Sequence, residues 1–205
     1  MSSSTGQVQQ GSQTLEASTE HGRLRILGFW IFLAGECALF ASLIGSYLAL
    51  HGQTAGGPTA QQVFNLPMTG AATVALLSSS FTCVLAIVGM QRGSRGAVTG
   101  GLIATILLGL CFMGFQVFEF VHYYKEGFTF TNSAFGSSFY TLVGFHGGHV
   151  TFGIIWLVAL LLTTMRRELD GDLASRLYVG GLYWHFVDVV WVIIFTVVYL
   201  MGKMG

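Results

Sequence analysis

The chain contains five long apolar stretches, and each is long enough to cross a lipid bilayer as a helix. The hydrocarbon layer is about 30 Å thick and takes about 20 helical residues to span. Inside it, a segment has no water to bond with and must satisfy its own backbone groups, which favours helices. We therefore predict an all-α integral membrane bundle of five transmembrane helices, over about residues 25–50, 66–90, 97–124, 133–165 and 174–201.

The composition fits a membrane protein. Only 9% of the 205 residues are charged, whereas a soluble domain carries about a quarter. The formal net charge is zero, so no basic surface suggests a nucleic-acid partner. Residues 1–22 differ, being rich in Ser, Thr, Gln and Gly. We predict a disordered polar cytoplasmic tail there, followed by a transmembrane domain over residues 23–205.

The positive charges predict the orientation. Cytoplasmic loops of membrane proteins carry an excess of Lys and Arg. With five spans, seven arginines fall on the side of the N-terminus, and only Lys125 and Lys203 fall opposite. We therefore predict a cytoplasmic N-terminus and an external C-terminus. The seven are Arg23, Arg25, Arg92, Arg95, Arg166, Arg167 and Arg176.

Ionisable residues inside the spans are the candidate functional residues, because an unpaired charge in hydrocarbon costs several kcal/mol. Six of them form three i, i+3 pairs, which places both members on one face of a helix. From their depths we expect a buried hydrogen-bonded network that can hold protons. The alternative is a structural role as polar contacts between helices, worth about 0.6 kcal/mol each. The candidates are Glu36, Glu119, His122, His146, His149, His185 and Asp188.

A metal site is the sharper alternative. Glu119 and His122 have the Glu-x-x-His spacing of di-iron bundles, but such sites need two of these motifs and the chain has one. We therefore predict no metal in this chain. The cysteines at 37, 83 and 111 lack metal-binding spacing and are predicted to be packing residues. The step from Gly144 to Gly148 is predicted to allow close helix packing.

Three segments resemble the cytochrome oxidase subunit III family. They are LGFWIFLAGECALFASL in the first span, GFHGGHVTFG in the fourth and YWHFVDVVWVIIFTVVYL in the fifth. The resemblance covers about residues 23–202. It is closest to the short five-helix bacterial forms, which lack the first two of the seven helices found in longer members.

The resemblance implies an accessory subunit, in the bacterial cytoplasmic membrane, of a complex that reduces oxygen to water and pumps protons. Haem and copper would lie in partner subunits I and II, with direct packing on subunit I and a small subunit IV as a further partner. This subunit would support proton uptake and the stability of subunit I, and would bind phospholipid. Glu36 matches the family's buried glutamate, and Glu119, His146, His149, His185 and Asp188 match its polar framework. Arg166 and Trp184 are the expected lipid-binding residues; the family's arginine itself falls in register with Thr163.

The resemblance favours cytochrome c as electron donor, because FTFTNSAFGSSFYTLVGFHGGHV and the LMGKMG tail look most like the caa3-type form. The same subunit of a quinol oxidase is the alternative. Two hypotheses from other classes rank below it. One is a stand-alone membrane di-iron oxidase using Glu119, His122, His146 and His149, and the other is a small proton-coupled carrier centred on Glu36.

Overall fold

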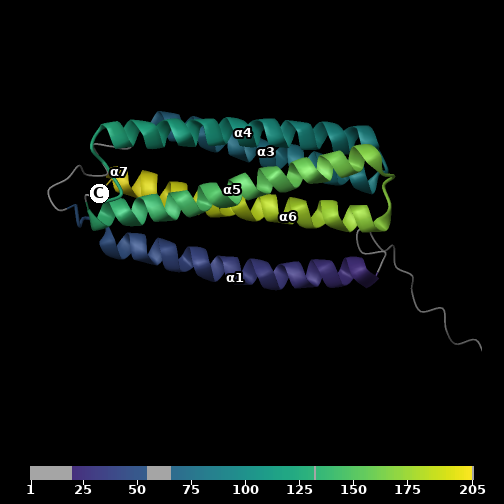
Figure 1. The fold of residues 1–205 in the computed structure, drawn as a ribbon, viewed down its shortest axis with the longest axis horizontal. Helices are drawn as coiled ribbons and strands as arrows, with labels where there is room; N and C mark the ends of the chain where they lie inside the picture. The colour runs from purple at the N-terminus through teal and green to yellow at the C-terminus, as the bar shows by residue number, and fades with distance from the viewer. Residues whose placement is uncertain (1–19, 55–65, 132, 205) are drawn as a thin grey trace, which may run out of the picture.

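The computed structural model describes residues 20–54, 66–131 and 133–204, and its helices run side by side along one axis (Figure 1). Within these described residues, five helices are long and apolar enough to cross a membrane, so the predicted all-α bundle of five spans is confirmed. The last span continues from α6 through a π-helical segment, Phe195–Leu200, into the short α7. The bounds are α1 Glu20–Leu50, α3 Leu66–Gln91, α4 Arg95–Lys125, α5 Ala134–Arg166, α6 Gly171–Ile194 and α7 Met201–Met204.

The helix starts follow ordinary capping rules. Ser94, Ser133 and Asp170 precede α4, α5 and α6, and each side chain accepts a hydrogen bond from a backbone N–H of the first turn. The polar tail was predicted to reach residue 22, but α1 already begins at Glu20. Residues 1–19, which hold the rest of that prediction, lie outside the described part of the chain.

The helices form a layered arrangement. In Figure 1, α1 lies along one edge, α3 and α4 lie along the other, and α5 and α6 lie between them. The pair α3–α4 is closely packed because glycine brings the two backbones together. A Cβ added at Gly101 would come within 2.7 Å of the Ala86 Cβ, and one at Gly89 within 2.6 Å of the Ala97 Cβ.

The core centres on α6, whose two tryptophans are fully buried. The Trp184 Nε1 donates to the Ser79 Oγ at 2.9 Å, and the Trp191 Nε1 donates to the Thr73 Oγ1 at 3.0 Å. Both indoles therefore satisfy their one polar atom on α3 while they fill the interior. In contrast, only 11% of the most apolar window of α1 is buried, which is what a lipid-facing helix shows.

The start of α1, the α3–α4 turn and the α5–α6 turn lie at the same end of the bundle (Figure 1). The Arg25 side chain reaches Asp172 on α6, and the Arg95 Nη2 donates to the Thr164 carbonyl of α5 at 2.7 Å. The arginines are therefore gathered at one end, as the sequence predicted. Which side of the membrane this end faces stays a prediction.

Candidate functional site

Glu36 of α1 and His149 of α5 meet in the middle of their helices. The His149 Nε2 lies 3.0 Å from the Glu36 Oε2, and the His149 Nδ1 lies 2.8 Å from the Phe145 carbonyl oxygen. Because a carbonyl only accepts, the Nδ1 carries a hydrogen and donates it. The contact between the His149 Nε2 and the Glu36 Oε2 then shares one proton, which is carried by one atom or the other. The two side chains are 19% and 16% exposed, so the pair lies at the edge of the bundle rather than at its centre.

A groove of about 450 Å³ lies beside this pair, mainly between α1 and α5. Gly144 and Gly148 leave it open, since a Cβ added at either would meet nothing within 4 Å. The prediction that these glycines allow close helix packing is therefore wrong, because they face a hollow. The groove is lined by Phe32, Gly144, Phe145, Gly148, His149, Phe152 and Tyr183.

His185 and Asp188 lie on the side of α6 that meets α3. The His185 Nδ1 is 2.6 Å from the Ser80 Oγ. Asp188, one turn further along, is 3% exposed, and its carboxylate lies near the Ser80 hydroxyl that also contacts His185. His146 is fully buried and stacks on Trp191, with ring centroids 5.0 Å apart.

Glu119 and His122 separate, although they are three residues apart on α4. Glu119 is buried and accepts a hydrogen bond from the Thr69 hydroxyl. The His122 side chain is 46% exposed and lies 3.3 Å from Glu126. The structure thus places the seven ionisable residues in separate pairs and single positions. Of these seven, only Glu36 and His149 share a hydrogen bond in the described part of the chain.

The two expected lipid-binding residues have different surroundings. Arg166 ends α5 and is exposed at the arginine-rich end of the bundle. Trp184 is fully buried, and a Cβ added at Gly109 or Gly153 would come within 3.0 Å of its ring. Assigning a lipid contact to Trp184 was wrong, because the glycines of α4 and α5 enclose its indole inside the bundle.

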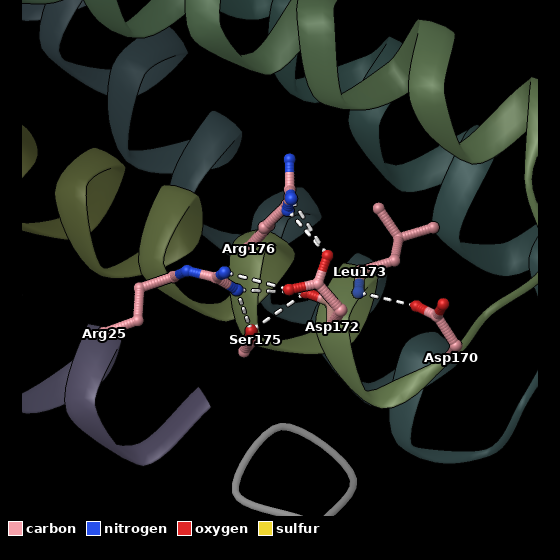
Figure 2. Close-up of polar contacts among 6 residues, drawn as sticks. All are labelled: Arg25, Asp170, Asp172, Leu173, Ser175 and Arg176. Carbon is pink, nitrogen blue, oxygen red and sulfur yellow. Dashed lines mark hydrogen bonds and ion pairs between the residues drawn. The ribbon is translucent and has the colours of Figure 1, made fainter. Parts of the chain in front are cut away.

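The sequence analysis missed one cluster, at the arginine-rich end (Figure 2). The Arg25 Nη2 of α1 lies 2.9 Å from the Asp172 Oδ1 of α6, and the Arg176 Nε donates to the other carboxylate oxygen at 3.0 Å. Arg25 also donates to the Ser175 hydroxyl. The signal was a lone acidic residue in the first turn of a helix, within reach of the arginines that had been used only to predict orientation.

The structure also shows where the cysteines lie and how the possible metal ligands are arranged. Cys83 is buried in the core, as predicted, but Cys37 and Cys111 lie on the outer surface. Within residues 20–54, 66–131 and 133–204, no three His, Cys, Asp or Glu side chains are arranged to hold a metal ion. The di-iron set is dispersed, with His146 against Trp191, His149 on Glu36 and His122 on Glu126.

Comparison with known proteins decides the family. The family described as cytochrome c oxidase subunit III matches residues 19–203. The chain belongs to the cytochrome c oxidase subunit III family. This makes it subunit III of a haem-copper respiratory oxidase and a multi-pass bacterial membrane protein.

Cytochrome c oxidase subunits and a quinol oxidase subunit resemble this chain to a similar extent. It is 50% identical to the cytochrome c oxidase subunit 3 of Bacillus sp. (strain PS3) over 188 residues, covering 92% of this chain and 91% of the relative. It is 49% identical to that of Bacillus subtilis (strain 168) over 199 residues, covering 95% and 96%. Its identity to the quinol oxidase subunit 3 of Bacillus subtilis (strain 168) is 46% over 191 residues, covering 93% and 94%.

Proposed function

We propose that this subunit III is the non-catalytic part of a cytochrome c oxidase, with haem and copper held by partner subunits I and II. The observation that carries the proposal is the Glu36–His149 contact, a proton-sharing pair 3.0 Å apart beside an apolar groove. Such a pair can hold a proton, join two helices and line a lipid site, and none of these tasks is redox chemistry. Direct packing on subunit I, and on a small subunit IV, belongs to the same proposal.

The pair has two roles in this proposal. It joins α1 to α5, and it buffers a proton inside the membrane near the route by which the complex takes protons up. The other ionisable residues act as a polar framework that fixes the helices relative to one another. They are Glu119, His122, His146, His185 and Asp188.

The groove is proposed to hold a phospholipid acyl chain, with the headgroup phosphate at Arg166. Arg166 lies two heptads beyond Phe152 on α5, which is about 21 Å along the axis and only about 40° around it. It therefore stands over the groove at the arginine-rich end of the bundle. Arginine suits this role because its guanidinium donates two parallel hydrogen bonds to a phosphate.

Cytochrome c is the proposed electron donor and quinol is the alternative, since relatives with both names match at 46–50% identity. Subunit III itself does not select the donor in either case. The donor is therefore tested on the whole complex, by comparing oxidation of reduced cytochrome c with oxidation of a quinol.

The test is purification of the native complex in a mild detergent through a tag on this chain. We expect haem absorbance bands, iron and copper in the preparation, and their loss from this chain when the complex is dissociated with a harsher detergent. Iron that stays on the isolated chain in stoichiometric amount, with no haem-bearing partner, would reject the proposal and favour the di-iron enzyme.

A further inference from the structure

The second half of α1 is firmly anchored on the bundle. Tyr47 is fully buried there, and Phe40, which is 3% exposed, packs against the His149 ring with ring centroids 5.0 Å apart. Just beyond the helix, the Gln53 carbonyl accepts a hydrogen bond from the Phe135 N–H at 3.4 Å. This end of α1 is therefore fixed to α5 by both apolar and polar contacts.

The first half of α1, residues 20–35, meets the bundle largely through apolar side chains. Phe29, for example, contacts the Tyr183 ring with ring centroids 6.4 Å apart. Between membrane helices such contacts give little net stabilisation, because lipid tails are as apolar as the side chains that they replace. The ion pair of Arg25 with Asp172 therefore has a large share in holding this half of α1 on α6.

The contact between Arg25 and Asp172 can open without leaving the carboxylate unpaired (Figure 2). Arg176 contacts the other carboxylate oxygen with its Nε at 3.0 Å and its Nη2 at 2.9 Å. The Ser175 hydroxyl donates to the Asp172 carbonyl whether or not Arg25 is present. The Arg25 and Asp172 side chains are 31% and 39% exposed, so a phosphate at this end of the bundle can reach the guanidinium.

The first half of α1 also forms one wall of the groove. Phe32 lines the groove, seven residues after Arg25 and four before Glu36, while the other lining residues belong to α5 and α6. Two polar contacts thus flank the wall, one on each side of Phe32. The position of this half of α1 therefore sets the width of the groove.

We propose that the first half of α1 is a movable wall of the groove, latched by Arg25 on Asp172 and released when the phosphate of an anionic phospholipid binds Arg25 instead. The wall turns about the contact between Glu36 and His149, and the groove opens towards the arginine-rich end. A guanidinium donates two parallel hydrogen bonds to a phosphate as it does to a carboxylate, so Arg25 stays paired in both states. The inference rests on the proposed function, which places an acyl chain in the groove.

The lipid shifts the position of the wall because it binds the two states differently. A phosphate can engage the Arg25 guanidinium fully only after Asp172 has released it, and a ligand shifts an equilibrium by its preference for one state. A zwitterionic phosphatidylcholine carries a choline that offsets its phosphate, so it competes less well for Arg25. The open state should therefore be populated in anionic membranes and rare in zwitterionic ones.

Distances between spin labels in the purified complex test the proposal. Labels are attached to ketone-bearing amino acids placed at Leu27 on α1 and Ile155 on α5, which are 60% and 64% exposed. Nanodiscs of phosphatidylglycerol are compared with nanodiscs of phosphatidylcholine. We expect a second, longer distance in phosphatidylglycerol. The control pair, Leu48 and Ala134, joins the same two helices at their other ends and should give one distance in both lipids. A single distance for both pairs in both lipids would overturn the inference.

A pair of variants tests the latch itself. Arg25→Gln removes the ion pair, so we expect the longer distance between labels at 27 and 155 in both lipids. Arg23→Gln removes an exposed arginine of the same turn and should respond to lipid as the parent does. A short distance in both lipids for Arg25→Gln would show that apolar packing holds the wall and would reject the latch.

Lipid exchange tests whether the wall controls access to the groove. Replacement of bound lipid by deuterated phosphatidylglycerol, followed by native mass spectrometry, should be several-fold faster in Arg25→Gln than in Arg23→Gln. Equal rates would overturn the role of the wall in lipid entry. Absence of haem from the parent preparation would mean that the proposed function fails, whereas the label distances report on the wall in either case.

Discussion

The buried Trp184 side chain determines how large the residues packed against it can be. Its ring fills the space between Gly109 on α4 and Gly153 on α5, and its Nε1 is fixed by Ser79 on α3. The ring cannot move without breaking that hydrogen bond, so the two glycines have no room for a side chain. The glycines therefore act by being small rather than by being flexible.

Gly109→Ala should destabilise the subunit by about 1–3 kcal/mol, the usual cost of overpacking a closed core. The added Cβ would lie 2.8 Å from the Trp184 ring. Gly114→Ala on the same helix is the matched control, since nothing lies within 4 Å of its added Cβ. Thermal unfolding of the purified complex, followed through this subunit, measures both variants. Equal unfolding temperatures would show that the core accommodates the methyl group.

We expect Glu36 to stabilise the subunit mainly through its hydrogen bond with the His149 Nε2. Glu36→Leu leaves the His149 Nε2 without its partner, and an unpaired buried polar atom costs about 1–3 kcal/mol. Glu36→Gln keeps a side chain that can bond the imidazole, so assembly should stay close to the parent. The measurements are unfolding temperature and oxidase activity over many turnovers. Faster loss of activity in the glutamine variant supports the proton-buffering role, whereas unchanged activity would make the pair structural.

The sequence could identify which residues were chemically unusual, but not which of them meet. Helical periodicity gives the face of a residue within its own helix, whereas contact also depends on how each helix is rotated against its neighbours. Glu36 was identified as a candidate because a charged carboxylate is unfavourable in hydrocarbon, but its pairing with His149 was not predictable. Gly144 and Gly148 were misassigned for the same reason, because a glycine step allows close packing only if another helix faces it.

At the scale of elements, α1 is the helix least enclosed by the rest of the chain. It packs mainly on α5 and α6, and its polar contacts include Arg25 to Asp172 at one end and Glu36 to His149 in the middle. The hydropathy of the sequence was enough to predict that α1 spans the membrane, because length and apolarity alone define a membrane helix. Hydropathy could not show that α1 lies at the edge, since every span looks equally apolar.

Arg25→Ala should loosen the first turns of α1 more than it lowers overall stability. An ion pair this exposed contributes only about 0.2–1 kcal/mol, but few other contacts hold this end. Hydrogen–deuterium exchange of residues 20–30 should rise, and Arg23→Ala serves as control because Arg23 is exposed on the same turn. Unchanged exchange in the Arg25 variant would mean that apolar packing alone holds the end of α1.

Filling the groove should displace lipid without unfolding the bundle. A Cβ at Gly148 meets nothing within 4 Å, so Gly148→Leu adds bulk to an open space. Gly114→Leu makes the same change at an open position on α4. Native mass spectrometry should then show less co-purified phospholipid for the Gly148 variant only. Equal lipid in both variants would place the bound lipid elsewhere.

At the scale of the whole molecule, the arginines at one end predict how the subunit sits in the membrane. The structure brings this end together through the contact of Arg25 with Asp172 and that of Arg95 with the Thr164 carbonyl. Five spans then place the far end of α4 and the start of α5 on the opposite side. Positively charged loops are retained in the cytoplasm, so the turn at Gly93 should face the cytoplasm and the turn at Gly127 should face outward.

Cysteine labelling in intact cells tests this orientation. The three native cysteines lie within the spans and are replaced by alanine. Single cysteines then go to Ser94, beside the α3–α4 turn, and to Glu126, beside the α4–α5 turn; both positions are exposed. A membrane-impermeant maleimide should label the cysteine at 126 in whole cells and the cysteine at 94 only after the membrane is opened. The reverse pattern would invert the predicted topology, and the proposed phosphate contact of Arg166 would then belong to the outer leaflet.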